Sequence, residues 1–152
     1  MIMDNGLEES LITAWVRLTS ALKNSRITQG MNYNEAIVML SVYDRYRKDG
    51  EGLTPFKEIV RETKMLKSLV NRTIDSLVKQ NLLERSEGAD KRTTFVRPVR
   101  ENLDAYLRVH EQSLDLARKI ISFIGEEDAK AVVRISEKIS TVNPLGENNE
   151  SK

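Results

Sequence analysis

A helix followed directly by a β-hairpin is the feature that most limits how this chain can fold, and residues 64–98 carry it. Between Met65 and Val78 the apolar residues recur at spacings of three and four, which predicts one buried helical stripe. Asn81 is expected to end this helix, because asparagine tolerates the left-handed conformation that is common at helix C-termini. The opposite side of the helix is polar and consists of Lys67, Ser68, Asn71, Arg72, Asp75, Ser76 and Lys79.

The hairpin is predicted from strand-forming residues on both sides of a charged turn. Leu82 and Leu83 begin the first strand, residues 87–92 form a turn that includes a glycine, and residues 93–96 form a β-branched and aromatic second strand. Pro98 ends the second strand, because proline has no N–H to donate to a neighbour. The turn therefore holds two adjacent basic side chains at the tip of the hairpin.

A shorter helix is predicted just before this unit. Residues 49–52 have the sequence Asp-Gly-Glu-Gly and are expected to be a flexible connection. Thr54 followed by Pro55 predicts a helix start, with the hydroxyl as cap and the proline in the first helical position. The short helix is expected over residues 55–62, and a tight turn then leads to Met65. Two helices joined in this way form a helix-turn-helix, and the hairpin makes it a winged one.

The sequence Asp90-Lys91-Arg92, placed between two strands, resembles the wing of the multiple antibiotic resistance regulator (MarR) family, which carries an Asp-any-Arg motif followed by a β-strand. The similarity in element order extends over roughly residues 7–140. In that family the wing arginine enters the minor groove of DNA, and the aspartate orients it or an arginine of the recognition helix. The resemblance implies that Arg92 is the groove residue and Asp90 its support, with Arg72 as the second partner.

The start of the recognition helix departs from the family pattern. The family often has a glycine in the turn before this helix and a serine, threonine or aspartate as its cap. This chain has Lys64 and Leu66 at those places, so Thr63 is the alternative cap.

The rest of the chain is predicted to be mostly helical. Helices are expected over residues 7–28, from Asn32 to Lys48, over residues 101–124 and again after Gly125. Asn32-Tyr33-Asn34-Glu35 has the form of a capping box, in which two side chains satisfy free N–H groups of the new helix. This second helix is expected to bury Ile37, Val38, Leu40 and part of Tyr43.

The expected fold class is therefore mainly α, an α+β winged helix with six helices and a two-stranded β-hairpin wing. Residues 1–30 and 100–142 would form a helical dimerisation lobe, so that the first and last helices pair with each other and with a second subunit. Residues 31–99 would form the winged helix-turn-helix DNA-binding domain. Residues 143–152 are polar and are expected to be a disordered tail.

A homodimer is predicted from the fifth helix, where seven residues follow a heptad seam that needs a partner. They are Leu103, Leu107, His110, Leu114, Ala117, Ile121 and Ile124. A two-fold dimer would also double the few base contacts of one winged helix, over half-sites about 10 base pairs apart or a multiple of that. The family resemblance implies the same lobe, built from the first and last helices.

Positive charge gathers where the DNA-binding residues are predicted. Residues 57–100 contain eleven Lys and Arg against six Asp and Glu, although the whole chain has a net charge of only +1. A solvated surface is the alternative explanation, but a polar helix face and a basic hairpin tip in one segment favour nucleic acid. Major-groove contacts are expected from Lys67, Ser68, Asn71 and Arg72, phosphate contacts from Lys64 and Lys91, and a minor-groove contact from Arg92 supported by Asp90.

The aromatic residues suggest where an effector would bind. The resemblance implies that aromatic effectors bind between the dimer lobe and the DNA-binding lobe, and the candidate pocket residues are Trp15, Tyr43 and Tyr46. Packing in the core or at the interface is the alternative for each of them. His110 is the only histidine, so it cannot supply the clustered imidazoles of a zinc site, and no metal or cofactor is expected.

Other functional classes find little support in the sequence. It has no cysteine, no phosphate-binding glycine motif and no set of residues that one histidine could complete for catalysis, so an enzyme is not expected. No apolar run approaches the ~20 residues of a membrane span, so no membrane association is expected. The N-terminal residues lack the pattern of a signal peptide, which predicts a cytoplasmic protein.

These observations predict a DNA-binding transcriptional regulator that binds pseudo-palindromic operators in double-stranded DNA as a homodimer. The resemblance implies a repressor that a small aromatic effector releases. The rival hypothesis is a winged-helix module that binds protein and has no sequence-specific readout of DNA. The operator sequence, the identity of an effector and the regulated genes are not encoded in any pattern of the chain.

Overall fold

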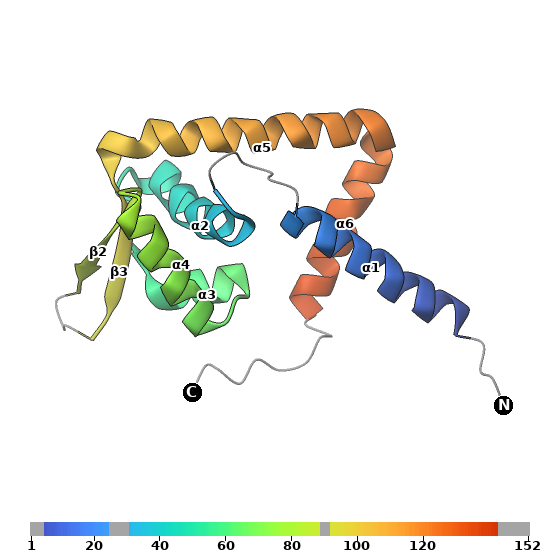
Figure 1. Ribbon diagram of the computed structural model, residues 1–152, viewed down its shortest axis with the longest axis horizontal. Coiled ribbons are helices and arrows are strands. Elements are labelled where there is room, and N and C mark those ends of the chain that lie inside the picture. The colour runs from blue at the N-terminus through green and yellow to red at the C-terminus, as the bar shows by residue number, and fades with distance from the viewer. Residues whose placement is uncertain (1–4, 25–30, 89–91, 143–152) are drawn as a thin grey trace.

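The computed structural model describes residues 5–24, 31–88 and 92–142 (Figure 1). Its longest helix, α5 (Leu103–Ile124), extends across the molecule and joins the winged helix at one end to α6 (Glu126–Val142) at the other. The remaining elements are α1 (Gly6–Asn24), α2 (Tyr33–Asp49), β1 (Thr54–Pro55), α3 (Phe56–Thr63), α4 (Lys67–Lys79), β2 (Leu83–Glu87), β3 (Thr94–Pro98) and the 3₁₀ turn η1 (Arg100–Asn102). The mainly α fold with six α-helices and a wing is confirmed.

The hydrophobic core lies within the winged helix. Its fully buried side chains come from α2, α3, α4 and the sheet, and Tyr106 of α5 closes it from the other side. They include Val38, Met39, Val42, Ile59, Val70, Ile74, Leu77, Leu83 and Val96. The expected burial of Leu40 is wrong, because this side chain lies on the other side of α2 from Val38 and Val42 and is 41% exposed.

The sheet has three strands in the order β1-β3-β2, all antiparallel, so the expected two-stranded wing gains a third strand. Thr54 pairs with Val96 and Pro55 with Phe95. The prediction that Thr54 caps a helix is wrong, because its hydroxyl donates to the carbonyl of Gly52 at 3.1 Å. Helix α3 begins one residue later than expected, with Pro55 as an N-cap that makes no side-chain hydrogen bond.

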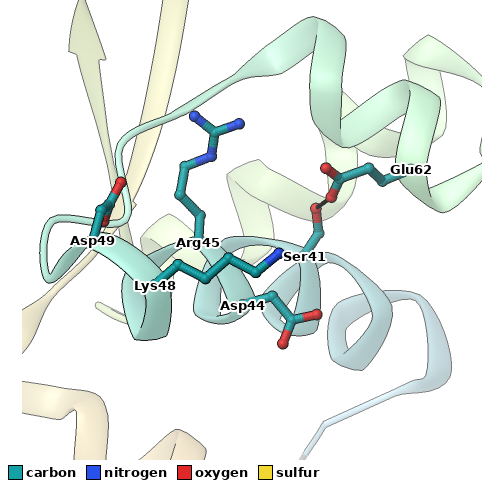
Figure 2. A pocket seen from close by; sticks show the side chains of 6 residues that line it. All are labelled: Ser41, Asp44, Arg45, Lys48, Asp49 and Glu62. Atoms are coloured by element: carbon teal, nitrogen blue, oxygen red, sulfur yellow. Dashed lines mark hydrogen bonds between the residues drawn. The ribbon is translucent and has the colours of Figure 1, made fainter.

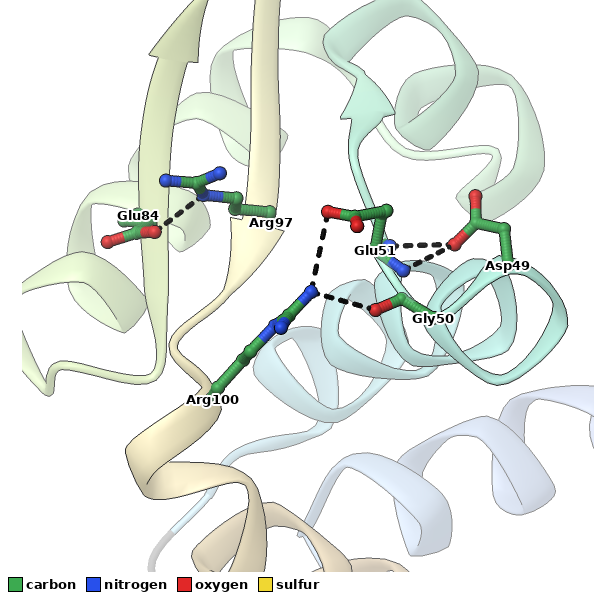
Figure 3. Close-up of polar contacts among 7 residues, drawn as sticks. Asp49, Gly50, Glu51, Glu84, Arg97 and Arg100 are labelled. Carbon is green, nitrogen blue, oxygen red and sulfur yellow. Dashed lines mark hydrogen bonds and ion pairs between the residues drawn. The ribbon is translucent and has the colours of Figure 1, made fainter.

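The connection between α2 and β1 is an ordered turn, where a flexible segment was expected. The Asp49 carboxylate accepts hydrogen bonds from the backbone N–H groups of Glu51 (2.8 Å) and Gly52 (2.9 Å). These donors, that of Gly52 first, hold the pKa of Asp49 below its ordinary value. Arg100, the first residue of η1, contacts the same turn. Its guanidinium donates to the Gly50 carbonyl at 3.0 Å and lies 3.4 Å from the Glu51 carboxylate (Figure 3).

Two glycines of this turn provide a test of its packing. Both have positive φ, +77° at Gly50 and +71° at Gly52, but only a Cβ on Gly52 would meet other atoms, Pro98 Cδ and Tyr46 Cβ at 2.8 Å each. Gly50→Ala should therefore cost about 1–2 kcal/mol of unfolding free energy from backbone strain alone. Gly52→Ala adds overpacking against the core and should cost about 3 kcal/mol or more. Urea unfolding of the two variants measures the difference, and equal losses would contradict it.

The helices outside the winged helix leave their apolar side chains exposed. No residue of α1 is buried, and none of residues 126–141 of α6 is buried. In the first half of α5 Tyr106 is buried against the winged helix but Leu107 is 37% exposed, and in the second half Leu114 is 37% exposed and Phe123 is 90% exposed. The heptad seam of α5 is thus open mainly in its second half.

Candidate nucleic-acid interface

Helix α4 has one buried side and one exposed side, as its apolar spacing predicts. Val70, Thr73, Ile74 and Leu77 are buried, and Ser68, Asn71 and Arg72 are exposed. The helix begins at Lys67, two residues later than expected, because the chain before it turns. Lys64 has a left-handed φ of 60°, and Leu66 is the N-cap without a side-chain hydrogen bond. Thr63 is not the cap of α4, because it is the last residue of α3. Its hydroxyl accepts the N–H of Met65 at 3.3 Å, before α4 begins.

The C-terminal end of α4 confirms the expectation for Asn81, whose φ is 61°. The N–H of Leu82 donates to the Leu77 carbonyl at 2.9 Å, and that of Asn81 donates to the Val78 carbonyl at 3.0 Å. These two hydrogen bonds are those of a Schellman motif, which satisfies the last carbonyls of the helix. The motif turns the chain directly into β2, so that the wing lies beside the helix it follows (Figure 1).

A groove of about 350 Å³ lies between the N-terminal half of α4 and the wing. It is lined by Phe56, Lys67, Ser68, Asn71, Arg85 and Thr94. Three of the four residues expected in the major groove, Lys67, Ser68 and Asn71, therefore share one surface with the sheet. Arg72, the fourth, is exposed on the same helix and forms no hydrogen bond or ion pair within the described part of the chain.

Arg85 is the residue of this surface that sequence reasoning missed. Its guanidinium Nη2 lies 2.5 Å from Asp75 Oδ1 and 3.1 Å from Asn71 Oδ1, so it connects β2 to α4. Asp75 thus faces the wing, and one side of Asn71 is already engaged. The opposite charges ten residues apart, on either side of the predicted helix end, were the available signal.

Ser76 does not belong to the exposed polar face on which the sequence placed it. Its hydroxyl donates to the carboxylate of Glu35 in α2 at 2.8 Å, on the side of α4 that packs against α2. The polar surface of α4 is therefore narrower than expected.

The wing is described only in part. Asp90 and Lys91 lie outside the described residues, so their expected roles have no structural counterpart here. Arg92 is exposed beside the turn, and Lys64 is exposed in the turn between α3 and α4. Arg97 and Glu84 are opposite each other in the register of β2 and β3, and Arg97 Nε lies 2.6 Å from Glu84 Oε1 in an exposed ion pair (Figure 3).

Four rings meet where α2 contacts α5. Tyr43 lies 6.4 Å from Tyr46, 5.1 Å from Tyr106 and 5.7 Å from His110, between ring centroids. Burial raises the pKa of the Tyr106 phenol, and the nearby carboxylate of Asp44 raises it further. The structure thus brings together two of the expected pocket residues, Tyr43 and Tyr46. Trp15 is on α1 and 42% exposed, and no ring contact joins it to them in the described residues.

A second hollow, of about 410 Å³, lies between α2 and α3 and is polar (Figure 2). It is lined by Ser41, Asp44, Arg45, Lys48, Asp49 and Glu62. The Ser41 hydroxyl donates to Glu62 Oε2 at 2.5 Å across it. None of the three residues expected to bind an effector lines this hollow.

The described residues contain no group of three or more His, Cys, Asp or Glu side chains that could hold a metal ion. In the same residues, none of the helices has both the length and the apolar character needed to cross a membrane.

Residues 30–93 match a model of the MarR family. The comparison with curated proteins finds no match. Among solved structures, the chain is similar to the MarR family transcriptional regulator Sco3205 from Streptomyces coelicolor in complex with DNA, with a TM-score of 0.76 at 14% identity, over 92% of this chain and 89% of that one.

Two more solved structures from Streptomyces coelicolor are similar along nearly their whole length. The MarR family transcriptional regulator AbsC has a TM-score of 0.75 at 14% identity, over 96% of this chain and 100% of that one. The transcriptional regulator PcaV in complex with its natural ligand has a TM-score of 0.71 at 9% identity, over 93% of this chain and 96% of that one. At such low identity these likenesses establish the fold.

Proposed function

We propose that this chain, whose residues 30–93 match a model of the MarR family, is a transcriptional regulator of that family. In this proposal it binds pseudo-palindromic duplex DNA as a homodimer and acts as a repressor that a small-molecule effector releases. The observation that carries the proposal is the polar side of α4, which lies beside the wing and exposes Ser68, Asn71 and Arg72 in its N-terminal half. The partial positive charge at the start of α4 adds to the attraction for phosphate.

In this proposal the side chains keep the roles that their positions support. Lys67, Ser68, Asn71 and Arg72 reach base edges and phosphates of the major groove, because they occupy the first two turns of α4 on its exposed side. Lys64 contacts phosphate from the turn before α4. On the wing, Lys91 contacts phosphate, and Arg92 enters the minor groove with Asp90 as its support.

The homodimer is supported by apolar surface that a single chain leaves exposed. Leucine, isoleucine, valine, phenylalanine and tryptophan side chains are exposed on α1, α5 and α6, and large exposed apolar surfaces mark sites of protein interaction. They include Leu7, Leu11, Ile12, Trp15, Val16, Leu18, Leu114, Ile120, Ile121, Phe123, Val132, Val133 and Ile135. Residues 1–30 and 100–142 are thus proposed as the dimerisation lobe, and residues 31–99 as the DNA-binding domain.

For the effector, we propose the region where α2 contacts α5. Tyr43 and Tyr46 supply aromatic surface there, and Trp15 would approach from the dimerisation lobe. A flat aromatic ligand suits such rings, because offset stacking adds to the burial of apolar area. The position is suitable for regulation, since α2 packs directly on α4.

The DNA-binding surface is tested by removing its cations. Lys67→Ala, Arg72→Ala and Arg92→Ala should each weaken binding to duplex DNA, and each lost phosphate contact should lower the salt slope of log K by about one unit. The triple variant should bind at least about 100-fold more weakly, from ~1 kcal/mol or more at each position. Titration of labelled DNA at several salt concentrations measures both quantities.

Arg118→Ala is the matched control, because Arg118 is on α5 and pairs with Glu111 and Asp115, away from α4. It removes one positive charge and should leave the salt slope unchanged. If the triple variant and the wild type bind DNA equally, the winged helix is the protein-binding module of the rival hypothesis.

A further inference from the structure

A buried carboxylate connects the first turn of α2 to the C-terminal half of α4. Glu35 is 6% exposed and uses both of its oxygens. Oε1 accepts the backbone N–H of Asn32 at 3.0 Å, and Oε2 accepts the hydroxyl of Ser76 at 2.8 Å and the side-chain amide of Gln80.

The Oε1 contact is half of the capping box, whose other half is the Glu35 N–H donating to Asn32 Oδ1 at 2.8 Å. A capping box accounts for one oxygen of its glutamate and needs no burial. The second oxygen of Glu35 accepts from Ser76 of α4 and from Gln80, the residue that directly follows this helix. The carboxylate therefore does more than cap α2.

The two donors restrict the rotation of α4 about its own axis relative to α2. Ser76 and Gln80 are four residues apart and lie on one side of the helix. The residues proposed to meet DNA, such as Ser68 and Arg72, lie on the exposed side. A helix packed through apolar contacts can rotate by small amounts, whereas directed hydrogen bonds to one fixed carboxylate resist that rotation. A rotation of α4 would move every reading side chain at once.

We propose that Glu35 is a positioning residue for DNA recognition, which sets the rotation of α4 relative to α2 through Ser76 and Gln80. The inference rests on the proposed function. The same carboxylate accepts the N–H of Asn32, the N-cap of α2, just after the proposed dimerisation lobe ends in the sequence. Glu35 therefore connects the start of α2 to α4.

The test removes the link from the α4 side and leaves the capping box intact. The double variant Ser76→Ala with Gln80→Ala should bind an operator selected from random duplex DNA about tenfold more weakly, the effect of losing ~1.4 kcal/mol. Its affinity for DNA of unrelated sequence should stay within about twofold, because phosphate contacts tolerate a small rotation. Binding is measured at a temperature where circular dichroism shows the variants fully folded, so that a lower melting temperature does not enter the comparison.

Asn32→Ala is the matched control, since it removes one hydrogen bond of the capping box and leaves both contacts to α4. It should lower the melting temperature and keep the operator affinity within about twofold, as the loss of a cap acts on stability. Glu35→Gln should weaken operator binding in the wild type, because the amide has one acceptor oxygen for the three donors that the carboxylate serves. It should add little in the double variant, where the donors from Ser76 and Gln80 are already absent.

Three results would overturn the inference. The folded double variant could bind the operator like the wild type, Asn32→Ala could reduce specific binding as much as the double variant does, or the effects of Glu35→Gln and the double variant could add fully. The proposed function fails separately, if the wild-type protein selects no sequence from random DNA.

Discussion

Leu114→Glu should convert the proposed dimer to a monomer. Leu114 is 37% exposed in the single chain and lies in the second half of the α5 seam, one heptad before Ile121. In a two-fold interface each substitution is present twice, and one buried charge without a partner costs about 3–5 kcal/mol. The dimer dissociation constant should therefore rise by more than about 1,000-fold, and sedimentation velocity at micromolar concentration should detect only monomer.

Binding to a two-site operator should fall with dimerisation, because each monomer retains the contacts of only one half-site. The wing and α4 keep their own core, so circular dichroism of the variant should show the same helical content. The control is Lys119→Glu, which places a glutamate on the side of α5 away from the seam and should remain a dimer. An intact Leu114→Glu dimer would show that the interface lies elsewhere on α1, α5 or α6.

The parts of the fold that the sequence predicted are those decided by neighbours in the chain. The apolar spacing between Met65 and Val78 gave the buried side of α4, and the same local chemistry gave the left-handed turn at Asn81 and the capping box at Asn32. For the capping box and the turn at Asn81 the partners are within five residues, so the local pattern contains all the interacting groups.

The errors concern partners that are distant in the chain. Thr54 has the local pattern of a helix cap, but its backbone pairs with Val96, and strand pairing takes it into the sheet. The local pattern predicts that Ser76 is an exposed polar residue of α4, but its hydroxyl donates to Glu35, which is 41 residues away in the chain. Spacing along one helix predicts which side is buried, but it does not show which helix covers that side or which polar residues at its edge are covered with it.

The seam of α5 shows the same limit. The heptad pattern assigned the whole seam to a second subunit, but in its first half Tyr106 and His110 contact Tyr43 of the same chain, whereas Leu107 and the second half stay exposed. Likewise Arg85 could have been paired with Asp75 only by placing β2 beside α4, which a helical pattern alone does not do.

Arg72→Ala should remove base preference at one operator position as well as affinity. Asn71 and Arg72 are neighbours on the exposed side of α4, but their surroundings differ. Asn71 Oδ1 accepts from Arg85 at 3.1 Å, so a bidentate contact to adenine would first have to release that hydrogen bond. Arg72 has no such partner in the described residues, and its guanidinium can meet the two acceptors of guanine directly. Arg72 is thus the stronger candidate for reading a base.

The expected loss is about 1–3 kcal/mol of discrimination at that position, measured by selecting bound sequences with the wild type and the variant. Arg72→Lys separates reading from charge, because lysine retains the cation and lacks the planar pair of donors. It should keep the salt slope of the wild type and lose most of the base preference. If Arg72→Lys retains the full preference, or if Arg72→Ala weakens binding equally for every sequence, Arg72 contacts phosphate alone. Base recognition would then pass to Asn71, at the cost of its hydrogen bond to the wing.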